Sequence, residues 1–168
     1  MTRLYFAYGS NLHPLRLAER VPSARPVGIA RLAEHALRFH KHGAGPSGKC
    51  DVVPTAGGTV YGALFRLDEH ELPLLDAAEP GYDRVEVRVT VDAGALDAFT
   101  YRAQPRRISP ELRPYGWYRD LVLLGARHHG LPAAYLAGLE ATAVRDDPDA
   151  ARAAAMGALL ARLRESLA

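Results

Sequence analysis

The first residues that could do chemistry form the run Tyr8-Gly9-Ser10-Asn11, which directly follows a short apolar and aromatic segment. A strand that ends in Gly-Ser-Asn before a helical turn can direct several backbone N–H groups at one point, which makes an anion-binding site. The Ser10 and Asn11 side chains add further hydrogen-bonding groups. From these residues alone, an ordinary turn at a strand end is the favoured interpretation.

The second candidate is Glu79, which precedes the helix-terminating pair Pro80-Gly81. A carboxylate at the C-terminal end of a helix meets the negative end of the helix dipole, and this raises its pKa. A general base that works near neutral pH needs such a pKa. A solvated acid at the helix end is the alternative, because spacing does not distinguish Glu79 from its neighbour Asp76.

Two other patterns resemble functional sites but lack essential parts. Residues 43–49 have the glycine and lysine spacing of a phosphate-binding P-loop, yet Cys50 stands where the magnesium-binding Ser or Thr belongs. The following residues, 51–54, have the composition of a strand, so no helix N-terminus is expected there. The histidines between residues 35 and 42 have no nearby cysteine or acid to complete a ligand set. We therefore expect neither a nucleotide site nor a metal site.

Length, charge and composition bear on the number of domains, the cellular compartment and the partners of the protein. The chain has 168 residues, a net charge of +2 and one cysteine, Cys50. We expect one domain over residues 1–168, in a reducing cytoplasm. The basic residues are scattered among acids, so no nucleic-acid partner is expected. No apolar run approaches the roughly 20 residues that span a bilayer, so no membrane partner is expected.

Hydrophobic periodicity predicts strands in the first two-thirds of the chain. Residues 84–91 alternate strictly, and residues 99–102 pair back on them. Residues 56–58, Ala-Gly-Gly, predict the turn of a hairpin. The other strands are predicted at residues 4–8, 27–40, 52–55 and 60–67.

Helices are predicted mainly towards the end of the chain. One begins near Pro14, and one runs from Asp68 to Glu79 with Asp68 and Glu71 as a capping box. Three more follow from residue 115, from residue 132 and at about residues 148–167, the last carrying Met156, Leu159, Leu163 and Leu167. This order predicts an α+β fold with a small mixed, mainly antiparallel β-barrel flanked by helices.

Taken together, these segments resemble the γ-glutamyl cyclotransferase superfamily, which includes AIG2-like and butirosin-pathway cyclotransferases. The opening signature is Tyr5-Phe6-Ala7-Tyr8-Gly9-Ser10-Asn11-Leu12. Later landmarks follow in the family's order, namely residues 60–65, the helix end at 75–79, residues 81–85, Tyr118 and Gly125-Ala126. The resemblance covers residues 4–139. It departs from the family at Pro80, where a glycine often follows the glutamate.

The resemblance implies an enzyme that cleaves a γ-glutamyl amide through attack by the substrate's own α-amine. The products are 5-oxoproline and a free amine. Glu79 would be the general acid/base, and the substrate would contact residues 5–12, Tyr82 and Tyr118, with no metal or cofactor. Glutathione, γ-glutamylamines, γ-glutamyl amino acids and a γ-glutamyl group on an acyl carrier protein are all compatible substrates.

Two other interpretations remain at this point. The same fold could be a non-catalytic module that binds γ-glutamyl compounds or amino acids. The last helix could make the chain a homodimer, or its apolar face could pack on its own domain and leave a monomer.

Overall fold

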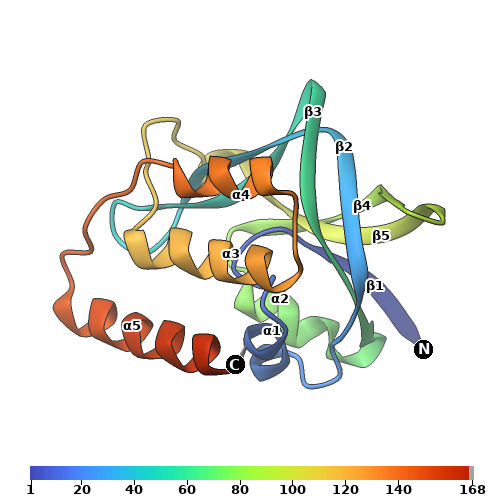
Figure 1. Ribbon diagram of the computed structural model, residues 1–168, viewed down its shortest axis with the longest axis horizontal. Coiled ribbons are helices and arrows are strands. Elements are labelled where there is room, and N and C mark those ends of the chain that lie inside the picture. The colour runs from blue at the N-terminus through green and yellow to red at the C-terminus, as the bar shows by residue number, and fades with distance from the viewer. Residues whose placement is uncertain (167–168) are drawn as a thin grey trace.

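The computed structural model describes residues 1–166 and has a closed five-stranded β-barrel at its centre (Figure 1). Neighbouring strands follow the order β1-β3-β2-β4-β5, and β5 closes on β1. Every pairing is antiparallel except the parallel contact between Tyr5 of β1 and Phe99 of β5. The strands are β1 (Thr2–Ala7), β2 (Arg25–His42), β3 (Gly48–Asp68), β4 (Tyr82–Val91) and β5 (Gly94–Ala103). The predicted α+β class with a mixed, mainly antiparallel barrel is confirmed.

The predicted hairpin at residues 56–58 is wrong, because β3 runs through these residues without a turn. Gly57 has φ of 76°, and its N–H donates to the Glu34 carboxylate of β2 at 2.9 Å. A Cβ on Gly58 would lie 2.4 Å from the carbonyl oxygen of His35. The two glycines therefore allow an irregularity inside the β2–β3 ladder, where the register shifts between Ala33 and His35.

The turn between β2 and β3 instead lies in the P-loop-like segment. Gly43 N–H donates to the Ser47 carbonyl at 2.9 Å, and β3 starts at Gly48. The prediction that strand rather than helix follows this segment is confirmed. A phosphate bound there would have no helix N-terminus to hold it.

The helices are α1 (Pro14–Arg20), α2 (Leu72–Ala78), α3 (Gly116–His128), α4 (Ala133–Glu140) and α5 (Ala150–Glu165). Short 3₁₀ helices occupy Glu69–Glu71 and Pro105–Arg107. The predicted capping box is wrong: Asp68 makes no side-chain cap, and Glu71 accepts hydrogen bonds from Ser23 instead. Asp149 caps α5 through the Arg152 N–H. Leu167, predicted on the face of this helix, lies outside the described residues.

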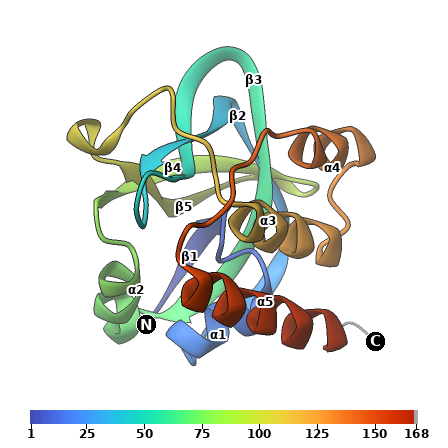
Figure 2. The same cartoon turned by 90° about the vertical axis from the view of Figure 1, so that its left-hand side faces the viewer.

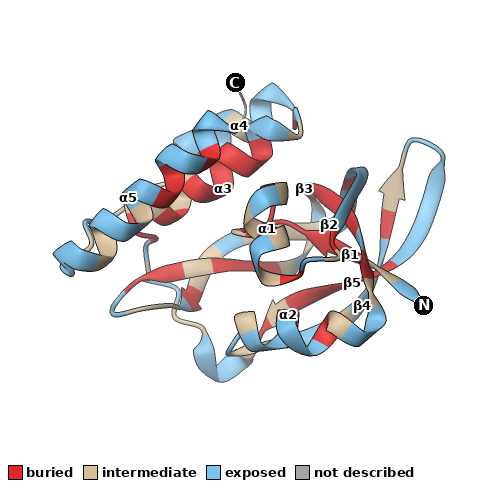
Figure 3. Ribbon diagram, turned by 90° about the horizontal axis from the view of Figure 1, so that it is seen from below, coloured by how far each residue is buried: buried red, intermediate tan, exposed pale blue. Residues whose placement is uncertain are grey.

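The last three helices form a layer beside the barrel, with α3 between α4 and α5 (Figures 1 and 2). The buried face of α5 packs on α3 (Figure 3). Its leucines Leu159, Leu160 and Leu163 contact Leu121 and Leu124. The apolar stripe of the last helix therefore packs on its own chain. Within residues 1–166, no helix is both long and apolar enough to cross a membrane.

Candidate active site

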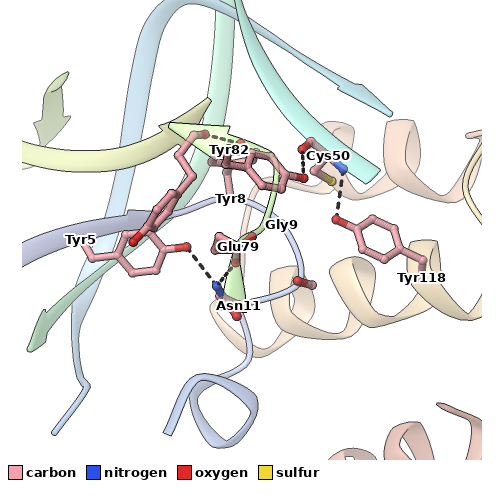
Figure 4. A pocket seen from close by; sticks show the side chains of 10 residues that line it. Tyr5, Tyr8, Gly9, Asn11, Cys50, Glu79, Tyr82 and Tyr118 are labelled. Carbon is pink, nitrogen blue, oxygen red and sulfur yellow. Dashed lines mark hydrogen bonds between the residues drawn. The ribbon is translucent and has the colours of Figure 1, made fainter. Parts of the chain in front are cut away.

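A small polar cavity of about 20 Å³ opens where the end of β1, the start of β3, the end of α2 and α3 meet (Figure 4). Most of its walls are tyrosines and the loop that follows β1. The lining residues are Tyr5, Tyr8, Gly9, Ser10, Asn11, Cys50, Glu79, Tyr82, Tyr101 and Tyr118.

Close packing fixes the loop that follows β1. A Cβ on Gly125 of α3 would lie 2.5 Å from Leu12 Cβ, and one on Gly62 of β3 would lie 2.3 Å from the Ala7 carbonyl oxygen. These two glycines therefore let a helix and a strand approach both ends of the loop. Leu12 N–H closes the turn by donating to the Gly9 carbonyl at 3.1 Å.

The amides of this loop are available to a ligand. Among residues 1–166, the N–H groups of Gly9, Ser10 and Asn11 donate to no protein acceptor. Three consecutive donors beside one cavity can hold a carboxylate or a developing oxyanion.

Glu79 is the C-cap of α2, where the backbone leaves the helical conformation, and only 13% of its side chain is exposed. The Asn11 side-chain N–H group donates to Glu79 Oε1 at 2.7 Å and to the Tyr5 hydroxyl at 3.1 Å. Arg20 donates to Asn11 Oδ1 at 2.9 Å and lies 3.6 Å from Glu79 Oε1. Burial raises the pKa of Glu79, and the Arg20 charge and the Asn11 hydrogen bond oppose that rise.

Two tyrosines hold the backbone of Cys50 at the far wall. The Tyr82 hydroxyl donates to the Cys50 carbonyl at 2.7 Å, and the Cys50 N–H donates to the Tyr118 hydroxyl at 3.0 Å. Burial raises the pKa of the Cys50 thiol to about 12, so this thiol stays protonated at neutral pH. It is not an activated nucleophile.

Most of the residues that the sequence predicted line this one cavity, but three do not. Phe6, Ala7 and Leu12 are fully buried in the hydrophobic core and are absent from the cavity wall. The sequence analysis missed Cys50 and Tyr101 of the lining, and it missed Arg20 beside Glu79. Alternation along residues 99–102 could have placed Tyr101 on the same face as Phe99, which stacks on Tyr5 at 5.3 Å.

The cavity contains one carboxylate, and nowhere in residues 1–166 do three or more His, Cys, Asp or Glu side chains gather as a metal site would require. The available chemistry is that of a partly desolvated base beside a row of backbone donors. Such a pair can take a proton from a bound group and stabilise negative charge on an oxygen nearby.

Comparisons with known proteins find similar sequences and similar structures. Residues 59–139 match the AIG2-like family. Over 152 residues, the chain is 30% identical to the human gamma-glutamylcyclotransferase, covering 85% of this chain and 80% of the human protein. The bovine gamma-glutamylcyclotransferase is also 30% identical, over 79% of this chain and 74% of its own. A solved structure of a gamma-glutamyl cyclotransferase superposes with a TM-score of 0.81 at 28% identity, covering 88% of this chain and 92% of that one.

Proposed function

The chain belongs to the γ-glutamylcyclotransferase family, and we propose that it converts a γ-glutamyl amide into 5-oxoproline and a free amine, with Glu79 as general acid/base. The observation that carries the proposal is the position of Glu79. It is largely withdrawn from water, held by Asn11, and faces a cavity beside three loop amides that donate to no acceptor within residues 1–166. Pure binding of an ammonium group would not require a carboxylate whose pKa is raised.

The proposed reaction moves two protons from the α-nitrogen to the leaving nitrogen through one carboxylate. Glu79 takes a proton from the substrate's α-ammonium, and the free amine attacks the γ-carbonyl carbon. The tetrahedral intermediate collapses when protonated Glu79 gives this proton to the leaving nitrogen and the amide C–N bond breaks. The ring nitrogen then loses its second proton to the same carboxylate, which passes it to the released amine. Because the attack is intramolecular, holding the folded substrate supplies a large part of the rate enhancement.

The loop after β1 is placed both to bind the substrate and to stabilise the negative charge that develops on its carbonyl oxygen. We infer that the amides of Gly9, Ser10 and Asn11 bind the α-carboxylate or the oxyanion, and that Tyr82 and Tyr118 shape the opposite wall. The nucleophile belongs to the substrate and the base to the protein. The reaction therefore needs neither a metal nor a cofactor.

Product analysis in ¹⁸O-labelled water tests this mechanism with free and N-acetylated γ-glutamyl amides. The free substrate should give unlabelled 5-oxoproline. The acetylated substrate should be inert, because its nitrogen lone pair is delocalised into the acetyl carbonyl and the nitrogen carries no ammonium proton for Glu79 to take. Labelled glutamate as the first product, or turnover of the acetylated substrate, would identify a hydrolase instead. Binding of 5-oxoproline without turnover of any amide would identify a non-catalytic binding module.

A further inference from the structure

The C-terminal end of α3 contacts the loop that follows β1 from outside the cavity. Gly125 and His129 lie four residues apart at this end, so they face the same side of the helix. A Cβ on Gly125 would lie 2.5 Å from Leu12 Cβ, which shows how closely the helix approaches the loop. One turn later, His129 Nε2 lies 2.6 Å from the Leu12 carbonyl oxygen. A carbonyl oxygen can only accept, so the imidazole donates this hydrogen bond.

The His129 ring is fixed in both orientation and protonation state. Phe65 of β3 meets it edge-on with ring centres 5.8 Å apart, and the His128 ring meets it at 5.0 Å. Burial lowers the pKa of His129, so the imidazole is neutral at pH 7 and carries its proton on Nε2. The loop therefore faces a donor that keeps one direction.

Leu12 connects this donor to the amides that face the cavity. The residue is fully buried, and its N–H group donates to the Gly9 carbonyl, which closes the turn. Among residues 1–166, no group other than His129 donates to the Leu12 carbonyl. Without His129, a buried acceptor would lack a partner, and the peptide that carries it could rotate to find one. Such a rotation would also turn the amides that precede it in the loop.

The two other histidines of this cluster have different contacts. His13 accepts from the Leu15 N–H group at 3.2 Å and thereby caps α1. His128 is exposed, lies 5.2 Å from the His13 ring, and makes no hydrogen bond within residues 1–166. Of the three imidazoles, only that of His129 donates to the loop.

We propose that His129 is a positioning residue, which directs the amides of residues 9–11 at the substrate through the Leu12 carbonyl. The inference rests on the proposed cyclotransferase reaction, in which these amides bind the α-carboxylate or the oxyanion. Stabilisation of this kind depends on donors that already point at the charge when it develops. His129 is not part of the cavity lining, so it acts on the reaction only through the loop.

His129→Phe is the central variant, because it keeps an aromatic ring against Phe65 and removes the N–H donor. The probes are glutathione, γ-glutamylmethylamide and γ-glutamylglycine, and the one that the parent protein cyclises fastest is used for all variants. We expect kcat/KM to fall by about tenfold in His129→Phe, a size typical of one lost hydrogen bond.

Two further variants show whether the N–H group causes the loss. His129→Gln should recover most of kcat/KM, because the glutamine amide can place an N–H donor near the position of Nε2. His128→Phe is the matched control, because it replaces a neighbouring ring that makes no hydrogen bond to the loop, and it should keep the parental kcat/KM.

The division of the loss between KM and kcat shows which group the loop amides bind. A rise in KM with an equal rise in the Kd of 5-oxoproline means that the amides hold the α-carboxylate. A fall in kcat with an unchanged Kd means that they hold the oxyanion. Either result supports the positioning role, because lower thermal stability alone changes neither KM nor kcat while the protein stays folded.

A measurement on the parent protein covers the case in which His129→Phe does not fold. A long-range ¹H–¹⁵N spectrum of the histidines should show His129 with its proton on Nε2. This signal should shift when 5-oxoproline fills the cavity. A proton on Nδ1 instead, or a signal that 5-oxoproline leaves unchanged, would overturn the assignment.

The outcomes separate this inference from the proposed function. Parental kinetics in a folded His129→Phe, or an equal loss in His128→Phe, would overturn the role of His129 and leave the cyclotransferase assignment intact. A folded His129→Gln that recovers nothing would do the same. If the parent protein forms 5-oxoproline from none of the three probes, the proposed function itself fails.

Discussion

Glu79 and Asp76 are two carboxylates at the end of the same helix, three residues apart, yet their surroundings differ sharply. Each has an arginine at a similar distance, Arg20 at 3.6 Å from Glu79 and Arg84 at 3.4 Å from Asp76. Each also accepts one hydrogen bond of 2.7 Å, Glu79 from Asn11 and Asp76 from Tyr101. The side chain of Asp76, however, is 43% exposed, whereas that of Glu79 is 13% exposed.

Residue type and bonding partners are therefore not enough to make a carboxylate a general base. Water screens the charge of Asp76, so its ion pair with Arg84 contributes little. Glu79 leaves the helix at its C-cap and turns into the cavity, where desolvation raises its pKa. Position relative to the barrel therefore separates a catalytic candidate from a surface acid.

The strongest test of the comparison exchanges each acid for its amide. Glu79→Gln should lower kcat by about 10²- to 10⁴-fold, because it removes the general base and preserves the shape of the side chain. Asp76→Asn should stay close to the parent in kcat. Steady-state formation of 5-oxoproline measures both, and calorimetric binding of 5-oxoproline checks that the cavity of Glu79→Gln is intact. Near-parental turnover of Glu79→Gln would remove the distinction between the two acids.

A second test addresses the loop that lies beside Glu79 and has no counterpart beside Asp76. Gly9→Val should abolish binding of 5-oxoproline, because a Cβ there already lies 3.1 Å from Cys50 Cβ and 3.7 Å from the Tyr118 hydroxyl. Ser10→Ala removes one hydroxyl and should weaken binding by about 1 to 3 kcal/mol. Titration calorimetry measures both affinities, and thermal melting identifies a variant that fails to fold. Parental affinity in a folded Gly9→Val and in Ser10→Ala would contradict the role of the loop.

Local patterns in the sequence were enough to predict much of this fold. Strict alternation of valines predicted β4, which the structure places at Tyr82–Val91. The end of α2 one residue before Glu79 follows from Pro80-Gly81, which cannot continue a helix. The glycine pair Gly57-Gly58 misled the prediction, because a glycine suits an irregularity within a ladder as well as a turn. Only the pairing of residues distant in sequence decides between the two.

The residues of the candidate site also fall into two groups, those that the sequence predicted and those that it did not. Asn11 and Glu79 were predicted because the opening motif and the order of the later segments resemble one family, whereas spacing alone did not distinguish Glu79 from Asp76. Arg20 and Cys50 were missed because nothing near them in sequence indicates a site. Arg20 reaches Glu79 only because α1 packs beside α2, and Cys50 lines the cavity only because Tyr82 and Tyr118 hold its backbone. Such contacts form only when the whole barrel closes.

The finest test of the comparison removes the arginine partner of each acid. In Arg20→Met the positive charge that opposes the effect of burial is lost, so the pKa of Glu79 should rise further. A base is active when deprotonated, so the acid limb of the pH profile of kcat/KM should move to higher pH, with activity near the alkaline plateau affected less. Arg84→Met is the matched control, because its partner Asp76 is screened by water and lies outside the cavity lining, and its profile should overlay that of the parent. Because Arg20 also orients the Asn11 amide, a uniform loss of rate without a shift of the limb would mean that Arg20 acts by positioning Asn11 alone. A shift in Arg84→Met equal to that in Arg20→Met would show that burial does not separate the two carboxylates.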